Sequence, residues 1–257
     1  MKDNTNNKDY WNNYVDYWEK KVAEANDKNV VGDKTNDNVI LREYFKKVNA
    51  FPNDRVLDFG CGMARLYPIV KEISPKSQYI GVDVSKKTLE HASKEYNNLV
   101  INENLYECDG KTIPFKDNYF DKIICFGVFD ACNQEQILYE LLRVLKTNGV
   151  LLLTGKNHKY YENDKEALIA ERNAREKGHP NYFTDVKYLK DQLNRNNMEV
   201  IEEYYFERRG DFPKNKYLST MPNRFYEFAV IIKKSGEIRE KFEKFSDIYS
   251  KTYCFRR

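Results

Sequence analysis

The sequence predicts an α/β fold in which helices cover both faces of a mainly parallel, seven-stranded sheet. Two observations lead to this prediction. Between residues 55 and 154, short apolar, β-prone segments alternate with amphipathic helical segments, which is the pattern of right-handed βαβ units. The last two expected strands are joined by a loop too short for an ordinary crossover helix, so we expect the seventh strand to run antiparallel. Together these features describe a Rossmann-like three-layer sandwich.

The chain of 257 residues fits one domain with additions at both ends. Residues 1–50 are expected to form an N-terminal helical cap. Its first helix, over residues 8–25, has one apolar stripe with three tyrosines beside it. The stripe consists of Trp11, Val15, Trp18 and Val22, and the tyrosines are Tyr10, Tyr14 and Tyr17. A second helix is expected over residues 38–48.

The sheet and its helices are expected within residues 51–234. The expected strands are 55–58, 78–83, a weak strand near Leu105, 122–126, 150–154, 199–206 and 227–232. The expected helices are 65–73, 85–96 with Ser85 as its N-cap, 134–145, 165–176 and 185–196. Segments 155–197 and 207–224 should add less regular structure at one edge of the ligand cleft. Residues 235–257 are expected to form a charged helical tail.

The composition excludes several classes of function. A net charge of +3, with charges of both signs interspersed, gives no argument for a nucleic-acid partner. There is no long apolar run, and the polar N-terminus does not resemble a secretory signal. The five cysteines form no CxxC pair and no zinc spacing, which favours free thiols in a reducing compartment. We therefore expect a cytoplasmic protein without nucleic-acid or membrane partners.

The segment RVLDFGCGMAR, residues 55–65, indicates which kind of nucleotide this fold would bind. Gly60 and Gly62 allow a tight turn and a close approach of the backbone to a ligand. Asp58 lies two residues before the first glycine, where a carboxylate would repel the pyrophosphate of a dinucleotide. S-adenosylmethionine carries a sulfonium and an α-ammonium instead of phosphate, so Asp58 suits it, and Arg65 is placed to meet the methionine carboxylate. The loop therefore predicts S-adenosylmethionine as the cofactor.

Two further acidic residues follow expected strands, at the edge where such sheets bind ligands. Asp83 ends the second strand, and its carboxylate can accept both ribose hydroxyls; the alternative is a surface acid that caps the next helix. Asp109 and Gly110 follow the third strand, where a carboxylate can accept the adenine amino hydrogens. An ordinary Asp-Gly turn explains that pair equally well.

The pattern as a whole resembles the class I S-adenosylmethionine-dependent methyltransferases, in the branch that includes quinone-biosynthesis and sterol enzymes. The resemblance rests on five segments, VLDFGCGMAR, GVDVS, ECDG, IPFKDNYFDKIIC and ELLRVLKTNGVLLLT, which follow the family's order over residues 54–154. The sequence departs from the family at Ala64, where many members have a third glycine. It departs again at Phe129-Asp130, where relatives often carry Leu-His or Leu-Glu.

The resemblance implies residues for each part of the methyl donor. The methionine half would be held by Asp58, Gly60, Cys61, Gly62 and Arg65, together with the backbone near Cys125 and Phe126. The ribose and adenine would be held by Asp83, Val84, Asp109 and Gly110. Relatives often close the cleft with an N-terminal helix, so Tyr14 would help to exclude water from the sulfonium. The sequence offers no Asn-Pro-Pro-Tyr element of base methylation and no acidic cluster for magnesium, so no metal is expected.

The acceptor site should come from the less regular segments. Asp130 and His158 are candidates for a general base, although Asp130 could equally cap a helix and His158 could be a surface residue. The cationic candidates for binding the acceptor are Arg172, His179, Arg208 and Arg209. Arginine forks suit phosphate or carboxylate groups, whereas a solvated basic loop is the alternative. The pattern thus favours a small, anionic acceptor.

The sequence therefore predicts methylation at oxygen of a small anionic or sugar-linked molecule. Residues 154–183 also resemble bacterial methyltransferases encoded with surface-polysaccharide genes, including those that make O-methyl phosphoramidate for capsules. A neutral, quinone-like acceptor and a non-catalytic methyltransferase-like subunit stay open as alternatives. A nicotinamide-dependent reductase is a third, although Asp58 and the missing third glycine count against it. Homodimerisation is also left open.

Overall fold

The computed structural model describes residues 7–17, 37–248, 250 and 252, and its centre is a seven-stranded sheet. The strands are β1 (Arg55–Phe59), β2 (Gln78–Asp83), β3 (Leu105–Glu107), β4 (Phe120–Cys125), β5 (Leu145–Lys156), β7 (Met198–Phe206) and β8 (Glu227–Lys234). Their order is β3-β2-β1-β4-β5-β8-β7. The pairs among β1 to β5 are parallel, whereas β8 lies antiparallel between β5 and β7. The predicted fold class, with its antiparallel seventh strand, is confirmed.

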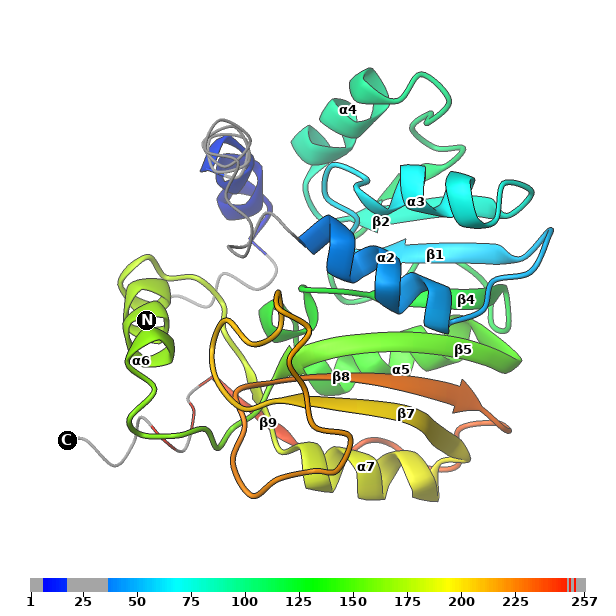
Figure 1. Cartoon of the computed structure of the whole chain (residues 1–257). Coiled ribbons are helices and arrows are strands. Elements are labelled where there is room, and N and C mark those ends of the chain that lie inside the picture. The colour runs from blue at the N-terminus through cyan, green and yellow to red at the C-terminus, as the bar shows by residue number, and fades with distance from the viewer. Residues whose placement is uncertain (1–6, 18–36, 249, 251, 253–257) are drawn as a thin grey trace.

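Helices cover both faces of this sheet (Figure 1). They are α2 (Asp37–Lys47), α3 (Leu66–Ile73), α4 (Lys86–Glu95), α5 (Gln134–Val144), α6 (Lys165–Glu176) and α7 (Val186–Arg195), with a short 3-10 turn η2 (Phe129–Ala131). Alternate residues of β1 point to opposite faces, so Val56 packs in the cluster that holds Phe45 of α2, and Leu57 in the cluster that holds Leu138 of α5. Ser85 caps α4 as predicted, since its side chain accepts from the amide of Thr88.

The parts of the fold that bear on function lie beyond the carboxyl ends of the parallel strands. Residues 8–17 form a helix there, and α6 lies at the same end of the sheet (Figure 1). The predicted N-terminal helix extends to residue 25, but Trp18 and Val22 lie outside the described residues. None of the helices in the described ranges is long and apolar enough to cross a membrane.

The predicted helical tail is wrong for residues 236–248, which contain no helix. Ser246–Asp247 instead form strand β9, which pairs antiparallel with β6 (Phe183–Thr184). The Glu135 carboxylate accepts hydrogen bonds from the amides of Phe245 and Ser246, both at 2.7 Å. These distant partners satisfy backbone groups that a helix would have satisfied locally, so tertiary contacts override the local preference.

Candidate functional site

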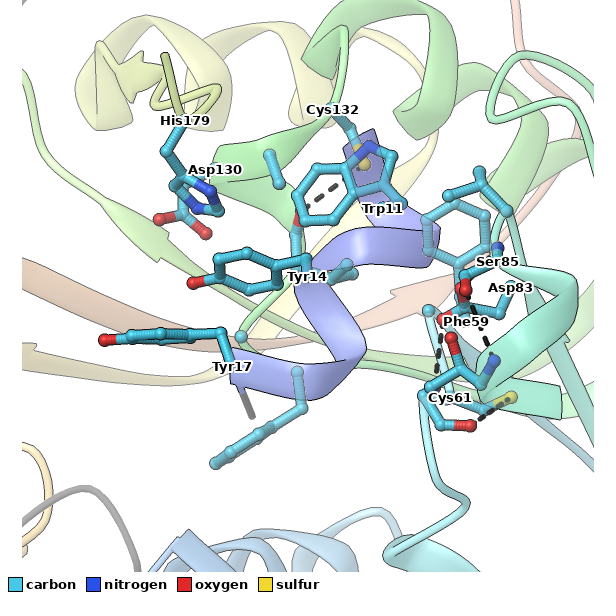
Figure 2. A pocket seen from close by; sticks show the side chains of 18 of the residues that line it. Trp11, Tyr14, Tyr17, Phe59, Cys61, Asp83, Ser85, Asp130, Cys132 and His179 are labelled. Atoms are coloured by element: carbon cyan, nitrogen blue, oxygen red, sulfur yellow. Dashed lines mark hydrogen bonds between the residues drawn. The ribbon is translucent and has the colours of Figure 1, made fainter. Parts of the chain in front are cut away.

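A cavity of about 730 Å³ opens at the carboxyl ends of β1, β2, β4 and β5. Its walls come from the loops that follow these strands, from helix 8–17 and from α6. Figure 2 shows that Asp83 and Ser85 lie to one side of helix 8–17, whereas Asp130 and His179 lie to the other. We call these two parts the donor side and the acceptor side.

The glycine loop after β1 forms the floor of the donor side. Gly60 and Gly62 have φ values of +68° and +50°, which side chains rarely allow. The amides of Gly60 and Cys61 both donate to the carbonyl of Val82, at 2.8 and 3.0 Å, and so tie the loop to β2. A Cβ atom on Gly60 would lie 2.5 Å from Cγ2 of Val128. The loop thus needs glycine both for its conformation and for the close approach of the segment after β4.

Two carboxylates lie side by side in the donor side. Asp58 is buried, and its Oδ2 accepts a hydrogen bond from the Tyr79 hydroxyl at 2.7 Å. Burial, together with repulsion from Asp83, raises the pKa of Asp58 to about 7, against the opposing effects of Tyr79 and Arg65. Burial also raises the pKa of Asp83, although its oxygens accept the amides of Ser85 at 2.8 Å and Gly62 at 2.9 Å. Such a pair repels phosphate and favours a ligand with cationic and hydroxyl groups.

Most residues predicted to bind the donor line this cavity. They are Tyr14, Asp58, Gly60, Cys61, Gly62, Arg65, Asp83, Val84, Gly110 and Phe126. The side chain of Cys125 does not, since it is fully buried within β4. Asp109 is exposed, and its Oδ1 accepts the amides of Lys111 and Thr112 at 2.8 and 2.7 Å. Asp109 therefore forms an ordinary Asp-Gly turn, the alternative to adenine binding that the sequence also allowed. Cys108 and Gly110 line the cavity beside it.

The acceptor side contains a partly buried ion pair. Nζ of Lys156, at the end of β5, lies 2.9 Å from Oδ2 of Asp130 and 3.7 Å from Oε1 of Glu171. It also donates to Oδ1 of Asn181 at 2.6 Å. Burial alone would lower the pKa of Lys156, yet the carboxylates of Asp130 and Glu171 together raise it above its usual value. Both Lys156 and Asp130 line the cavity.

A second cation of this region, Arg209, is held by a hydrogen bond. Arg209 lines the cavity and donates to the Tyr226 hydroxyl at 3.0 Å, while Tyr226 donates in turn to Glu171. Burial lowers the pKa of Arg209, but Tyr226 and Glu227 outweigh this effect and raise it. Glu171 therefore joins the arginine and the lysine in one buried network.

Aromatic rings from helix 8–17 form the opposite wall (Figure 2). Trp11, Tyr14 and Tyr17 all line the cavity. The ring of His179 stacks on Tyr14 with centroids 5.1 Å apart, and its Nδ1 lies 2.8 Å from the Tyr10 hydroxyl. Burial raises the pKa of Tyr10 to about 12, so this hydroxyl is neutral at physiological pH. The wall is therefore aromatic, and Nζ of Lys177 lies 4.9 Å from the centroid of the Tyr17 ring at its edge.

Three residues predicted for the acceptor site lie elsewhere. His158 is buried beside β6, with Nδ1 3.4 Å from Oδ2 of Asp185, because β5 ends at Lys156 and its alternation stops there. Arg172 is on the exposed face of α6. The Arg208 guanidinium lies 4.2 Å from the centroid of the Tyr161 ring. Of the predicted acceptor residues, Asp130, His179 and Arg209 line the cavity and these three do not.

Lys156 and the residues on one face of α6 also line the cavity, although the sequence did not predict them as site residues. The cavity-lining residues of that face are Glu166, Ile169, Ala170, Asn173, Ala174 and Lys177. Their spacing of three or four residues is that of a single helix face, and this pattern could have identified them. Arg172 falls outside this pattern, so it lies on the exposed face of α6 and does not line the cavity.

The comparisons with known proteins agree with this geometry. A family model described as a methyltransferase domain matches residues 50–203. The demethylmenaquinone methyltransferase of Lactobacillus johnsonii is 33% identical over 112 residues, which is 42% of this chain and 46% of that protein. An uncharacterized protein of Methanocaldococcus jannaschii is 25% identical over 204 residues, which is 77% of this chain and 66% of that protein. The chain thus spans about half to two thirds of the length of these relatives.

Solved structures of similar fold are numerous. A chain described as a possible histamine N-methyltransferase from Thermotoga maritima has a TM-score of 0.60 at 16% identity, over 88% of this chain and 98% of that one. The geranyl diphosphate C-methyltransferase of Streptomyces coelicolor, solved with S-adenosylhomocysteine, has a TM-score of 0.57 at 13% identity. This match covers 75% of this chain and 78% of that one. At such low identities, both similarities indicate a shared fold.

Proposed function

The chain belongs to the methyltransferase domain family, and on this basis we propose that it transfers a methyl group from S-adenosylmethionine to a ring compound that bears a hydroxyl group. The observation that carries the choice of acceptor is the acceptor side of the cavity. There an aromatic wall faces the carboxylate of Asp130, while the neighbouring Lys156 is paired with that carboxylate and Arg209 donates to the Tyr226 hydroxyl.

The donor side fits S-adenosylmethionine, which supplies an electrophilic methyl group when bound. Asp58 would hold the α-ammonium and Arg65 the methionine carboxylate. Asp83 keeps a second lone pair on each oxygen for the ribose hydroxyls, because the backbone amides of Gly62 and Ser85 use only one each. The same two carboxylates disfavour a pyrophosphate, so a nicotinamide dinucleotide is a poor match.

On the acceptor side, Asp130 would take the proton of the acceptor hydroxyl. Lys156 holds one oxygen of Asp130 at 2.9 Å, which fixes the direction of the other. Trp11, Tyr14 and Tyr17 would stack on the acceptor ring and exclude water from the sulfonium. Removal of the hydroxyl proton makes either the oxygen or an adjacent ring carbon nucleophilic.

An anionic acceptor, as expected from the sequence, is not favoured by this geometry. His158, Arg172 and Arg208 do not line the cavity, Arg209 is held by Tyr226 and its acidic neighbours, and the remaining lysine of the lining, Lys177, is exposed and lies over the Tyr17 ring. An incoming phosphate would have to compete with carboxylates that are already in place. We therefore prefer the quinone-like alternative over a surface-polysaccharide acceptor, and the similarity to demethylmenaquinone methyltransferase supports this preference.

A transfer assay tests the proposal. The protein is incubated with S-adenosylmethionine that carries a tritiated methyl group and with one of three compounds: dithionite-reduced 1,4-naphthoquinone, catechol or glucose 6-phosphate. We expect label in the naphthohydroquinone or the catechol and none in the sugar phosphate. Label in glucose 6-phosphate alone, or in none of the three, would overturn the proposed acceptor class.

Replacing Asp130 with asparagine should lower kcat for methylation of the naphthohydroquinone or catechol about 100-fold, because the amide cannot accept the hydroxyl proton. Binding of S-adenosylhomocysteine should not change, since Asp130 lies on the acceptor side. Single-turnover kinetics and calorimetry measure the two quantities. Asp117→Asn, at a largely exposed carboxylate that pairs with Arg143, is the matched control and should leave kcat unaltered. An equal kcat for Asp130→Asn and the wild type would exclude Asp130 as the base.

A further inference from the structure

We propose that Tyr79 is a positioning residue for the methyl donor, because its hydroxyl fixes the carboxylate that receives the donor's α-ammonium. The inference rests on the proposed role of Asp58 in holding that ammonium. It does not depend on the identity of the acceptor.

The geometry places Tyr79 behind the cavity rather than in it. Tyr79 belongs to β2, is 3% exposed, and is absent from the cavity lining, whereas Asp58 belongs to that lining. In the parallel register Tyr79 pairs with Val56, and Asp58 with Gly81, so both side chains lie on the same face of neighbouring strands. The Tyr79 hydroxyl reaches Oδ2 of Asp58 at 2.7 Å and thereby leaves Oδ1 to face a ligand.

The ring of Tyr79 is itself held in place. It packs edge to face against Tyr67 of α3, with centroids 5.3 Å apart, and Tyr67 lies at the same distance from Tyr96. A side chain that is fixed by packing can orient its hydrogen-bond partner without losing further conformational freedom. Tyr79 is therefore a rigid support for the Asp58 carboxylate.

The groups around Asp58 determine whether its carboxylate is ionised, and Tyr79 is one of them. Burial raises the pKa of Asp58 to about 7, and the charge of Asp83 adds to the effect. The Tyr79 hydrogen bond and the Arg65 guanidinium act in the opposite direction. The nearby thiols of Cys61 and Cys125 stay neutral, since burial raises the pKa of each well above its usual value. Tyr79 is thus the hydrogen-bond donor that favours the ionised carboxylate.

Donor affinity should therefore depend on pH with a defined sign. An α-ammonium binds the ionised form of Asp58, so affinity should rise as the pH increases through about 7 and decline as the pH falls below it. In Tyr79→Phe the ionised form loses a hydrogen bond, so the decline should begin at a higher pH. The amino group of the ligand loses its proton only at higher pH, and this alkaline limb should be common to both proteins.

Binding measurements on the full chain separate positioning from general damage. Tyr79→Phe should weaken binding of S-adenosylhomocysteine about 10-fold, as expected for one hydrogen bond to a charged group. It should not change the affinity for 5′-methylthioadenosine, which has the same nucleoside but no amino-acid half. Tyr205→Phe is the matched control. Tyr205 lies in β7, at the far edge of the sheet, and its hydroxyl accepts a hydrogen bond from Lys190 at 3.3 Å.

Each outcome of this experiment decides the question. Selective weakening for S-adenosylhomocysteine, with the acid limb moved to higher pH, supports the positioning role. Equal weakening for both ligands, an unmoved acid limb or unchanged affinity would overturn it. Failure of the wild type to bind S-adenosylhomocysteine would refute the donor assignment itself. Failure of the phenol assay alone would concern only the acceptor.

Discussion

Replacing Gly60 with valine should abolish measurable binding of S-adenosylhomocysteine, a loss of at least about 100-fold. Gly60 has a φ of +68°, a conformation that costs a β-branched residue about 1–2 kcal/mol or more. Its first side-chain atom would lie 2.5 Å from Cγ2 of Val128, so the loop after β1 and the segment after β4 would have to move apart. Both segments line the donor cavity, and their separation would destroy its shape.

Gly210→Val is a suitable control for this prediction. Gly210 has a φ of +86°, but a Cβ atom there would meet only Glu166 Oε2, at an ordinary 3.7 Å. The control therefore introduces similar backbone strain outside the cavity lining, and it should retain donor binding. Isothermal calorimetry on both variants, with circular dichroism to check folding, makes the comparison. Full affinity in folded Gly60→Val would mean that the loop does not hold the donor.

That most of the residues expected to bind the donor surround one cavity could be predicted from sequence, because their requirements are local. Gly60 and Gly62 are needed for positive φ values within one turn, and Asp58 and Asp83 lie at the ends of strands whose periodicity is evident. The antiparallel seventh strand follows from one connection, residues 207–226, that contains no helix. Each of these predictions depends on residues that are close in the chain.

The acceptor half could not be predicted in this way, because its contacts join distant segments. Lys156 meets Asp130 from another strand end and Glu171 from α6. His158 is only two residues beyond Lys156, yet it faces Asp185 because the strand has ended. The prediction of a helical tail was wrong for the same reason: the backbone amide of Phe245 donates to the distant Glu135 carboxylate and not to a carbonyl of a local helix. Long-range pairing decided each of these positions.

Replacing Lys156 with methionine should destabilise the protein by about 2–3 kcal/mol, between the cost of losing an exposed ion pair and that of losing a fully buried one. Methionine fills similar space, so the loss would be electrostatic. Lys156 is 17% exposed and lies between Asp130, at 16%, and Glu171, at 1%. Without the ammonium these two carboxylates would repel each other, and that of Glu171 is buried. Urea unfolding at neutral pH measures the change.

Lys146→Met provides the contrast at the other end of the same strand. Lys146 pairs with Asp121 at 2.6 Å, but both side chains are partly exposed, so this variant should lose no more than about 1 kcal/mol. The cost of Lys156→Met should also shrink at acid pH, where protons can neutralise the two carboxylates in the folded variant. Equal, small losses at both lysines, or a loss at Lys156 that grows on acidification, would show that the buried network does not depend on this charge. A large, acid-sensitive loss confined to Lys156 would instead mean that the carboxylate facing the acceptor is held in place by a charge that the fold itself requires.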